Sequence, residues 1–186
     1  MTTHLPFPAT PASFDADARG LLQSIVNVAR AIFGAAASSI FLLDGQTGEL
    51  VFQAVAGEGE GFLVGTRIPA RGIAGWVLGS GEAMVVEDLR SNESFARDLA
   101  AGTGYLPQAL MAVPLIDAED VLGVLEVLDP APQSRSNLDE LELLTLFACQ
   151  AAIALRVVTT RRASTEPVDD DQDLVHAFQE FLQARR

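Results

Sequence analysis

The sequence predicts an α+β domain built on a central antiparallel sheet, with its first and last main helices on one face and a helix-and-loop segment over the other. Two pairs of apolar runs, each joined by a short polar turn, favour antiparallel hairpins. The clearer pair covers residues 109–116 and 121–128, with the acidic turn 117–120 between the two runs. Apolar residues at helical spacing before the first pair and after the second predict the two covering helices.

The first part of the chain divides into elements at its glycines and polar turns. An amphipathic pattern predicts a helix at residues 15–33, which Gly34 ends. Residues 57–65 are rich in glycine and glutamate, and we expect a loop there with Phe62 as its buried anchor. The other elements expected before residue 90 are strands at 38–43, 49–56, 66–69 and 83–86 and a helix at 72–78.

The second part begins with a polar excursion at residues 87–104, in which we expect a helix at 94–101. The long hairpin follows, and then a helix that Ser136 or Asn137 can cap and that continues to about residue 162. The expected organisation is therefore a mobile leader at 1–15, a domain at 16–162, an acidic linker at 163–173 and an amphipathic tail helix at 174–186.

The composition removes several classes of function. The net charge of the 186 residues is −13, so we expect neither nucleic acids nor a membrane as partners. Lysine is absent, which removes Schiff-base and P-loop chemistry. One cysteine, Cys149, and two histidines, His4 and His176, make no catalytic or metal-binding set, so we expect no enzyme activity, no metal and no cofactor. Without a secretory signal, the chain is expected in the cytoplasm.

Four segments, taken in order, resemble the GAF domain, a family of small-molecule-sensing and signalling modules. They are SSIFLLDGQTGELVFQAVAG, GIAGWVLGSGEAMVVEDLRSNESF, LMAVPLIDAEDVLGVLEVLDP and the helix LDELELLTLFACQAAIALR. The resemblance covers about residues 16–162 and depends on the order of the segments rather than on any one of them. It implies a ligand cavity between the sheet and the segment 72–105, and dimerisation through the first and last helices.

Three better-known subtypes of the family do not fit this sequence. The cyclic-nucleotide subtype usually carries an Asn-Lys pair where this chain has Asp129 and Pro130. The bilin-binding subtype needs a cysteine near the cavity, whereas Cys149 lies in the last main helix. The subtype that reduces free methionine sulfoxide uses several cysteines. The resemblance therefore implies a GAF domain outside these three groups.

Glu126 is the sharpest candidate for a ligand contact. A strand alternates its side chains, so Glu126 faces away from its two apolar neighbours, and a buried carboxylate needs a cation, a polar ligand or water. A structural ion pair, or exposure on an edge strand, is the alternative. The strand face shared by Met111 and Val113 lines the cavity or belongs to the core. Trp76 is either a lid over the cavity or a core anchor. Tyr105 either contacts a ligand or covers the edge of the sheet. The expected cavity residues are Trp76, Phe95, Tyr105, Met111, Val113 and Glu126.

Two functions remain in competition. In the first, which we prefer, the domain is a non-catalytic signalling module that acts by homodimerisation and contact with a protein partner. In the second, it senses a small molecule in the cavity. The first is preferred because no kinase, cyclase or DNA-binding segment accompanies the domain. The residues expected at the interface, from the last main helix and the tail helix, are Leu141, Leu144, Phe147, Ala151, Leu174, Phe178, Phe181 and Leu182.

Overall fold

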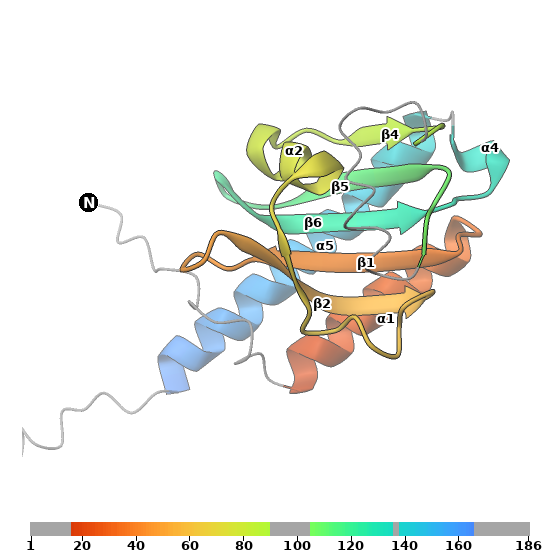
Figure 1. The fold of residues 1–186 in the computed structure, drawn as a ribbon. Helices are drawn as coiled ribbons and strands as arrows, with labels where there is room; N and C mark the ends of the chain where they lie inside the picture. The colour runs from red at the N-terminus through yellow and green to blue at the C-terminus, as the bar shows by residue number, and fades with distance from the viewer. Residues whose placement is uncertain (1–15, 90–104, 136–137, 166–186) are drawn as a thin grey trace, which may run out of the picture.

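A computed structural model of the chain describes residues 16–89, 105–135 and 138–165 (Figure 1). Within these ranges, six strands form one antiparallel sheet with the order β3-β2-β1-β6-β5-β4. The strands are β1 (Ala37–Leu43), β2 (Glu49–Gly57), β3 (Arg67–Pro69), β4 (Met84–Val86), β5 (Leu110–Asp117) and β6 (Asp120–Leu128). The helices are α1 (Ala16–Ile32), α2 (Gly72–Ser80), α4 (Pro132–Arg135) and α5 (Leu138–Thr165).

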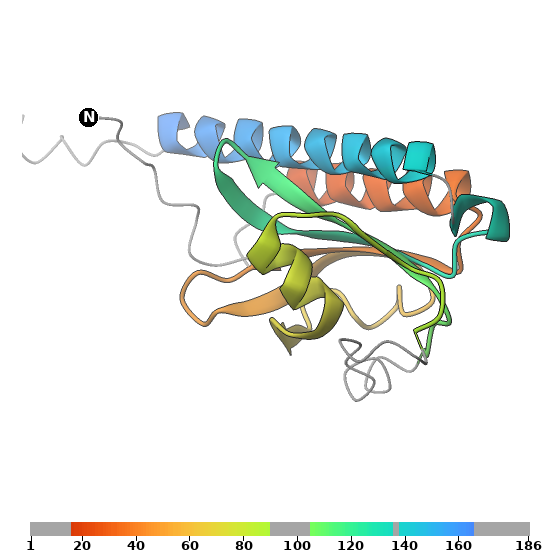
Figure 2. The same cartoon turned by 90° about the horizontal axis from the view of Figure 1, so that it is seen from above.

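The sheet separates two layers. Helices α1 and α5 lie side by side along one face, and α2 lies on the other face (Figure 2). The α+β architecture that the sequence predicts is therefore confirmed. Strand β6 pairs with β1 on one side and with β5 on the other, so the two hairpins meet at the centre of the sheet. Both faces of these central strands are covered, which explains why their apolar runs are nearly continuous.

The centre of the sheet depends on one glycine. A Cβ atom at Gly123 of β6 would lie 2.0 Å from the carbonyl oxygen of Phe41 on β1. The register of β1 against β2 shifts between Ile40 and Phe41, and such a bulge bends a strand locally. Only a residue without a side chain allows the two backbones to approach this closely.

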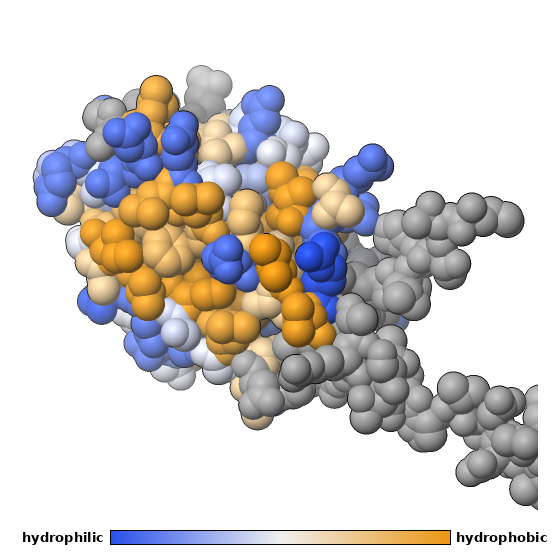
Figure 3. Space-filling model, turned by 180° about the vertical axis from the view of Figure 1, so that it is seen from behind, coloured by the Kyte–Doolittle hydropathy of each residue, from blue (hydrophilic) through white to orange (hydrophobic). Residues whose placement is uncertain are grey.

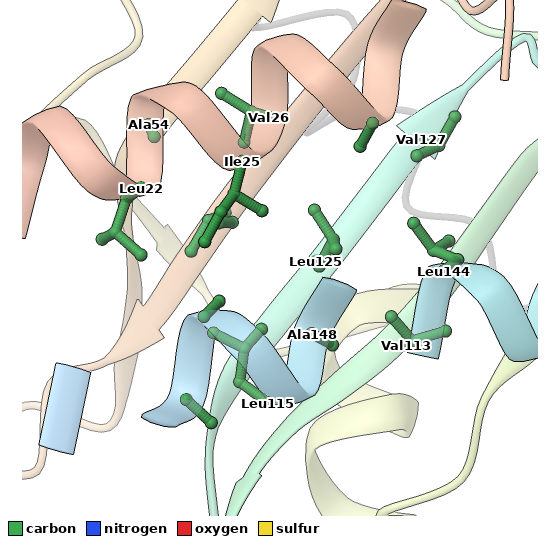
Figure 4. Packing of buried hydrophobic residues seen from close by; sticks show 14 of the residues in the cluster. Leu22, Ile25, Val26, Ala54, Val113, Leu115, Leu125, Val127, Leu144 and Ala148 are labelled. Atoms are coloured by element: carbon green, nitrogen blue, oxygen red, sulfur yellow. The ribbon is translucent and has the colours of Figure 1, made fainter. Parts of the chain in front are cut away.

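The larger core lies between the sheet and helices α1 and α5 (Figure 4). Both helices bury one stripe of side chains against the strands, as an amphipathic surface helix does. The side chains labelled in the figure are Leu22, Ile25 and Val26 from α1, Leu144 and Ala148 from α5, and Ala54, Val113, Leu115, Leu125 and Val127 from the strands. Burying each of the larger ones contributes roughly 1.5–3 kcal/mol to the free energy of folding.

The second core lies on the opposite face, between the sheet and α2. Phe41 of β1 and Phe52 of β2 are register partners, and their ring centroids lie 4.3 Å apart. Helix α2 buries Ile73, Ala74 and Val77 against this face. The pair of phenylalanines gives the face a rigid aromatic floor.

The glycine-rich loop corrects one expectation. Phe62 is 63% exposed, and its neighbour Leu63 is the buried anchor. Gly59 has a positive φ of 87°, and a Cβ atom there would lie 2.3 Å from the Leu63 side chain. The turn at Gly59 therefore folds the backbone onto Leu63, which leaves Phe62 pointing outward.

The end of α5 corrects a second expectation. The helix continues through Thr165, so the first three residues of the expected linker at 163–173 are helical. The expected leader, the helix at 94–101, the rest of the linker and the tail helix lie outside the described residues. Within the described ranges, no helix combines the length and the apolar character that crossing a membrane requires.

Candidate functional site

A cavity of about 100 Å³ lies between the sheet and the segment that contains α2. Such a space has room for roughly seven to ten water molecules, or for one compact organic molecule. Most of its lining is apolar, and residues from β1, β2, the glycine-rich loop, β3, α2, β5 and β6 contribute to it. The main apolar contributors are Phe41, Phe52, Val55, Leu63, Ile73 and Leu110.

Glu126 places a carboxyl group in this apolar lining. Its neighbours Leu125 and Val127 belong to the core beneath α1 and α5, so the alternation of β6 turns Glu126 to the cavity side. The residue is 8% exposed, and no described residue donates a hydrogen bond to its carboxyl group or forms an ion pair with it. Burial raises the pKa of the Glu126 carboxyl from 4.5 to about 7. At neutral pH this group is thus close to half ionised.

Small side chains flank Glu126 on both neighbouring strands. Its register partners are Ser39 on β1 and Ala112 on β5, and both are buried. The Ser38 hydroxyl donates a hydrogen bond to the backbone carbonyl oxygen of Glu126 at 3.0 Å, so this bond holds the strand and does not involve the carboxyl group. Because Ser39 and Ala112 are small, neither side chain fills the cavity in front of Glu126.

The rim of the cavity carries charges of both signs. Glu58, just after β2, and Arg71, just before α2, both line the cavity and are both exposed. Water screens charges in such positions strongly. The buried charge of the site is therefore that of Glu126.

Tyr105 is held at the edge of the cavity by Asp129. The Tyr105 hydroxyl donates a hydrogen bond to Asp129 Oδ2. The other carboxylate oxygen, Oδ1, accepts hydrogen bonds from the backbone N–H groups of Gln108 at 2.8 Å and Ala109 at 2.9 Å. Asp129 has a positive φ of 48°, a conformation that aspartate tolerates better than most residues. This one side chain thus ties the segment that enters β5 to the end of β6.

The structure places five of the six predicted cavity residues, in three groups. Glu126 and Tyr105 line the cavity. Met111 and Val113 do not: both are fully buried in the core beneath α1 and α5, so the prediction chose the wrong face of β5. Trp76 is 40% exposed on α2 and is not a lining residue. Phe95 lies outside the described residues.

Sequence reasoning missed the aromatic floor of Phe41 and Phe52 and the anchoring role of Asp129. A signal for the first exists in the alternation of β1, because Phe41 stands two residues from Ser39 and so shares its face. A signal for the second is the Asp-Pro pair directly after a strand, a combination typical of turns.

The predicted interface residues on α5 also need correction. Leu144 and Ala151 are fully buried in this chain, and Leu141 and Phe147 pack partly buried against the same core. The four residues predicted on the tail helix, Leu174, Phe178, Phe181 and Leu182, lie outside the described residues. Helix α5 carries apolar residues on more than one face, so the sequence did not decide which stripe faces the sheet.

A different apolar stripe faces outward. The face of the molecule that α1 and α5 cover carries a broad apolar surface (Figure 3). We call its exposed residues on these helices the outer strip: Leu21, Val28, Ile32, Leu138, Leu146, Ile153 and Val157. The most exposed of them, Leu138 and Leu146, are 76% and 62% exposed.

The described residues offer little for metal or thiol chemistry. No three His, Cys, Asp or Glu side chains within the described ranges are grouped so that they could hold a metal ion. Cys149 is exposed on α5, which lies across the sheet from the cavity. The chemical content of the cavity is therefore an apolar lining with one buried carboxyl group.

Comparison with known proteins agrees with this architecture. Residues 17–155 match the family model of the GAF domain. A curated relative, the "Probable 3',5'-cyclic phosphodiesterase pde-5" of Caenorhabditis elegans, is 25% identical over 145 residues, which make up 73% of this chain and 20% of that relative. A second, the mouse (Mus musculus) "Cone cGMP-specific 3',5'-cyclic phosphodiesterase subunit alpha'", is 29% identical over 48% of this chain and 10% of its own length. The chain thus spans a fifth or less of these relatives.

Solved structures share the fold at low identity. The GAF domain of a phosphoenolpyruvate-protein phosphotransferase from Coxiella burnetii superposes with a TM-score of 0.71 at 19% identity, covering 82% of this chain and 90% of that one. The second GAF domain of DevS from Mycobacterium smegmatis gives a TM-score of 0.64 at 21% identity, over 80% of this chain and 100% of that one. At these identities the likeness concerns the fold alone.

Proposed function

Because the chain belongs to the GAF domain family, we propose that it is a non-catalytic signalling module that acts by pairing with a second copy of itself. The observation that carries the proposal is the outer strip on α1 and α5 (Figure 3). Apolar surface of this extent is costly to keep in water, and it commonly marks a protein contact.

The spacing of the outer strip favours a helical partner. On α1, Leu21, Val28 and Ile32 are separated by seven and then four positions, and the exposed residues of α5 from Leu146 onward repeat the same intervals. These intervals put side chains on one line along a helix, as in helix pairs that bury a common seam. A second copy related by a two-fold axis presents the same line, so each strip covers the other.

The test is the mass of the protein in solution, measured by light scattering after size exclusion for two charge variants, Leu146→Glu and Ile153→Glu. We expect the wild type to have twice the mass of one chain and both variants to be monomers, because a buried carboxylate at the seam would lack a partner. Phe62→Glu is the matched control: it introduces the same charge at an exposed apolar residue on the glycine-rich loop. That variant should remain a dimer.

All three variants should unfold at temperatures close to that of the wild type, since each replaces an exposed side chain. A monomeric wild type over a wide range of concentrations would contradict the proposal. A dimer that survives both α5 substitutions would show that the contact lies elsewhere.

A second candidate function, sensing of a small molecule, is favoured by one observation: Glu126 is buried at the cavity and has no partner among the described residues. An unpartnered buried carboxyl group lowers stability, so its presence is better explained by a ligand than by folding. A screen of small metabolites by thermal unfolding tests it. A ligand that binds only the folded state raises Tm with concentration. The sensor function is wrong if no compound raises Tm and the cavity is closed by side chains in an experimental structure.

We infer further that the ligand is not a cyclic nucleotide, a bilin or methionine sulfoxide. The position of the Asn-Lys pair of the cyclic-nucleotide subtype is filled by Asp129, whose carboxylate is occupied by Tyr105 and two backbone N–H groups. The only cysteine of the chain, Cys149, lies across the sheet from the cavity. Cyclic GMP and cyclic AMP should therefore leave Tm unchanged, and a rise with either would overturn the inference.

A further inference from the structure

On the basis of the sensor function above, we propose that the cavity selects small organic cations, molecules with a compact apolar body and one positively charged nitrogen that pairs with Glu126. The geometry that supports this has two parts. The lining supplies an apolar space of about 100 Å³, and the carboxyl group that faces it is nine-tenths buried without a partner in the described part of the chain.

The apolar body has a defined place to bind. Phe41 and Phe52 form the aromatic floor, and Ile73 of α2 lies among the lining residues from the other layer. A flat or compact hydrocarbon body between them would leave water for an apolar surface. Aromatic rings also attract cations through their faces, which adds to the preference for a positive charge.

The charges around the cavity favour a cation over an anion. Counting every described element that contributes lining, the ionisable groups are Glu126 on β6, Glu58 after β2, Arg71 before α2 and Tyr105 before β5. Glu58 and Arg71 are both exposed and opposite in sign, so their effects largely cancel and are screened. An anionic ligand would therefore meet Glu126 without a buried cation to balance either charge, and this is costly.

A bound cation also compensates the cost of ionising the buried Glu126 carboxyl group. Burial raises its pKa to about 7, because the ionised form loses its hydration and has no compensating partner among the described residues. A bound cation supplies that partner, and a charge-assisted hydrogen bond in a water-poor site is stronger than a neutral one. Binding should therefore need the ionised carboxylate and should strengthen as the pH rises through 7.

The experiment uses three probes of nearly equal size: benzamidine, which is cationic; benzamide, which is neutral; and benzoate, which is anionic. Affinities are measured by calorimetry with the full chain at pH 8. We expect benzamidine to bind at least tenfold more tightly than benzamide, and benzoate not to bind. Benzamidine keeps its charge between pH 6 and 8, so its affinity should fall about tenfold at pH 6 as Glu126 takes up a proton.

Two variants test whether the preference for benzamidine depends on Glu126. Glu126→Gln keeps the shape of the side chain and removes its charge, so benzamidine should bind at least tenfold more weakly, without pH dependence. Glu82→Gln is the matched control, an identical change at an exposed carboxylate that does not line the cavity, and should alter the affinity less than threefold. Thermal unfolding of both variants confirms that they are folded.

Equal binding of benzamide and benzamidine overturns the cation preference and leaves the sensor function standing, because the cavity then still takes a ligand. Unchanged benzamidine binding by Glu126→Gln overturns it in the same way. Failure of all three probes to bind also overturns it, and the metabolite screen then decides separately whether the cavity takes any other ligand.

Discussion

Along β6, Leu125 and Val127 enter the core beneath α1 and α5, whereas Glu126 between them faces the cavity on the other side of the sheet. The helix side is filled by long aliphatic side chains from three directions, in the way that natural cores pack. The cavity side holds an aromatic floor, small residues on both neighbouring strands, and a carboxyl group that has no partner among the described residues.

The difference between the two faces separates stability from function. A filled apolar face lowers the free energy of the folded state and needs no further explanation. A cavity beside a buried acid raises the free energy of the folded state in two ways. The side chains around the cavity lose packing contacts, and the carboxyl group loses its hydration. Features that oppose stability in this way collect at functional sites, which is why we assign the ligand to the cavity side and the fold to the helix side.

The largest expected effect comes from truncating one leucine on each face. Leu125→Ala on the helix side should lower the free energy of unfolding by about 2–5 kcal/mol, the range for a fully buried leucine. Leu110→Ala, at a buried leucine that lines the cavity, should cost at least about 1 kcal/mol less, because its side chain already lacks neighbours on one side. Urea unfolding measures both. Equal losses would contradict the contrast between the faces.

The next effect concerns pH. The folded state raises the pKa of Glu126 from 4.5 to about 7. Between pH 4.5 and pH 7 the Glu126 carboxyl is therefore protonated in the folded protein but ionised in the unfolded chain. The contribution of Glu126 to stability is therefore complete below about pH 4.5 and is lost as the pH rises to 7. Relative to Glu126→Gln, the wild type should lose roughly 2–3 kcal/mol of unfolding free energy between pH 5 and pH 8. Parallel pH profiles for the two proteins would show that the carboxyl group is not buried.

A smaller effect is expected at the edge of the cavity. Tyr105→Phe removes the hydrogen bond to Asp129 and should lower the free energy of unfolding by about 1 kcal/mol. Because Tyr105 and Asp129 are not part of the outer strip on α1 and α5, the variant should keep the dimer mass of the wild type. Hydrogen exchange at the amides of Gln108 and Ala109 should become faster, and unchanged exchange would mean that Asp129 holds the segment without the tyrosine.

The smallest effect is expected at Trp76. Its side chain is 40% exposed and does not line the cavity. Trp76→Phe should therefore change the free energy of unfolding by less than about 0.5 kcal/mol, and it should leave benzamidine affinity within twofold. A large loss of affinity would restore Trp76 as a lid over the ligand.

The sequence predicts those structural features that the residue pattern within a single helix or strand decides. The hairpins, the helices at 16–32, 72–80 and 138–165, and the turn of Glu126 away from the face of its neighbours follow from periodicity along single elements, and the described residues confirm them. The choice of face for Met111 and Val113 does not follow from alternation, because both faces of β5 are buried and equally apolar. Only the side on which the helices pack distinguishes them.

The same limit applies to α5 and to the glycine-rich loop. A helix with apolar residues on more than one face can turn either Leu144 or Leu146 to the sheet, and its packing against β5 and α1 decides between them. In the loop, Phe62 and Leu63 are adjacent and both apolar, so the backbone at Gly59 determines which one is buried. Features set by contacts between distant elements were therefore the ones that sequence patterns left open.

The contrast between the two faces depends most directly on the state of one carboxyl group. Its titration can be followed by carbon-13 NMR of the glutamate side chains, with the Glu126 resonance identified by its absence from Glu126→Gln. We predict a midpoint near pH 7, in agreement with burial beside an apolar cavity. A midpoint at the ordinary glutamate value of 4.5 would place this group in water and contradict the account of the cavity.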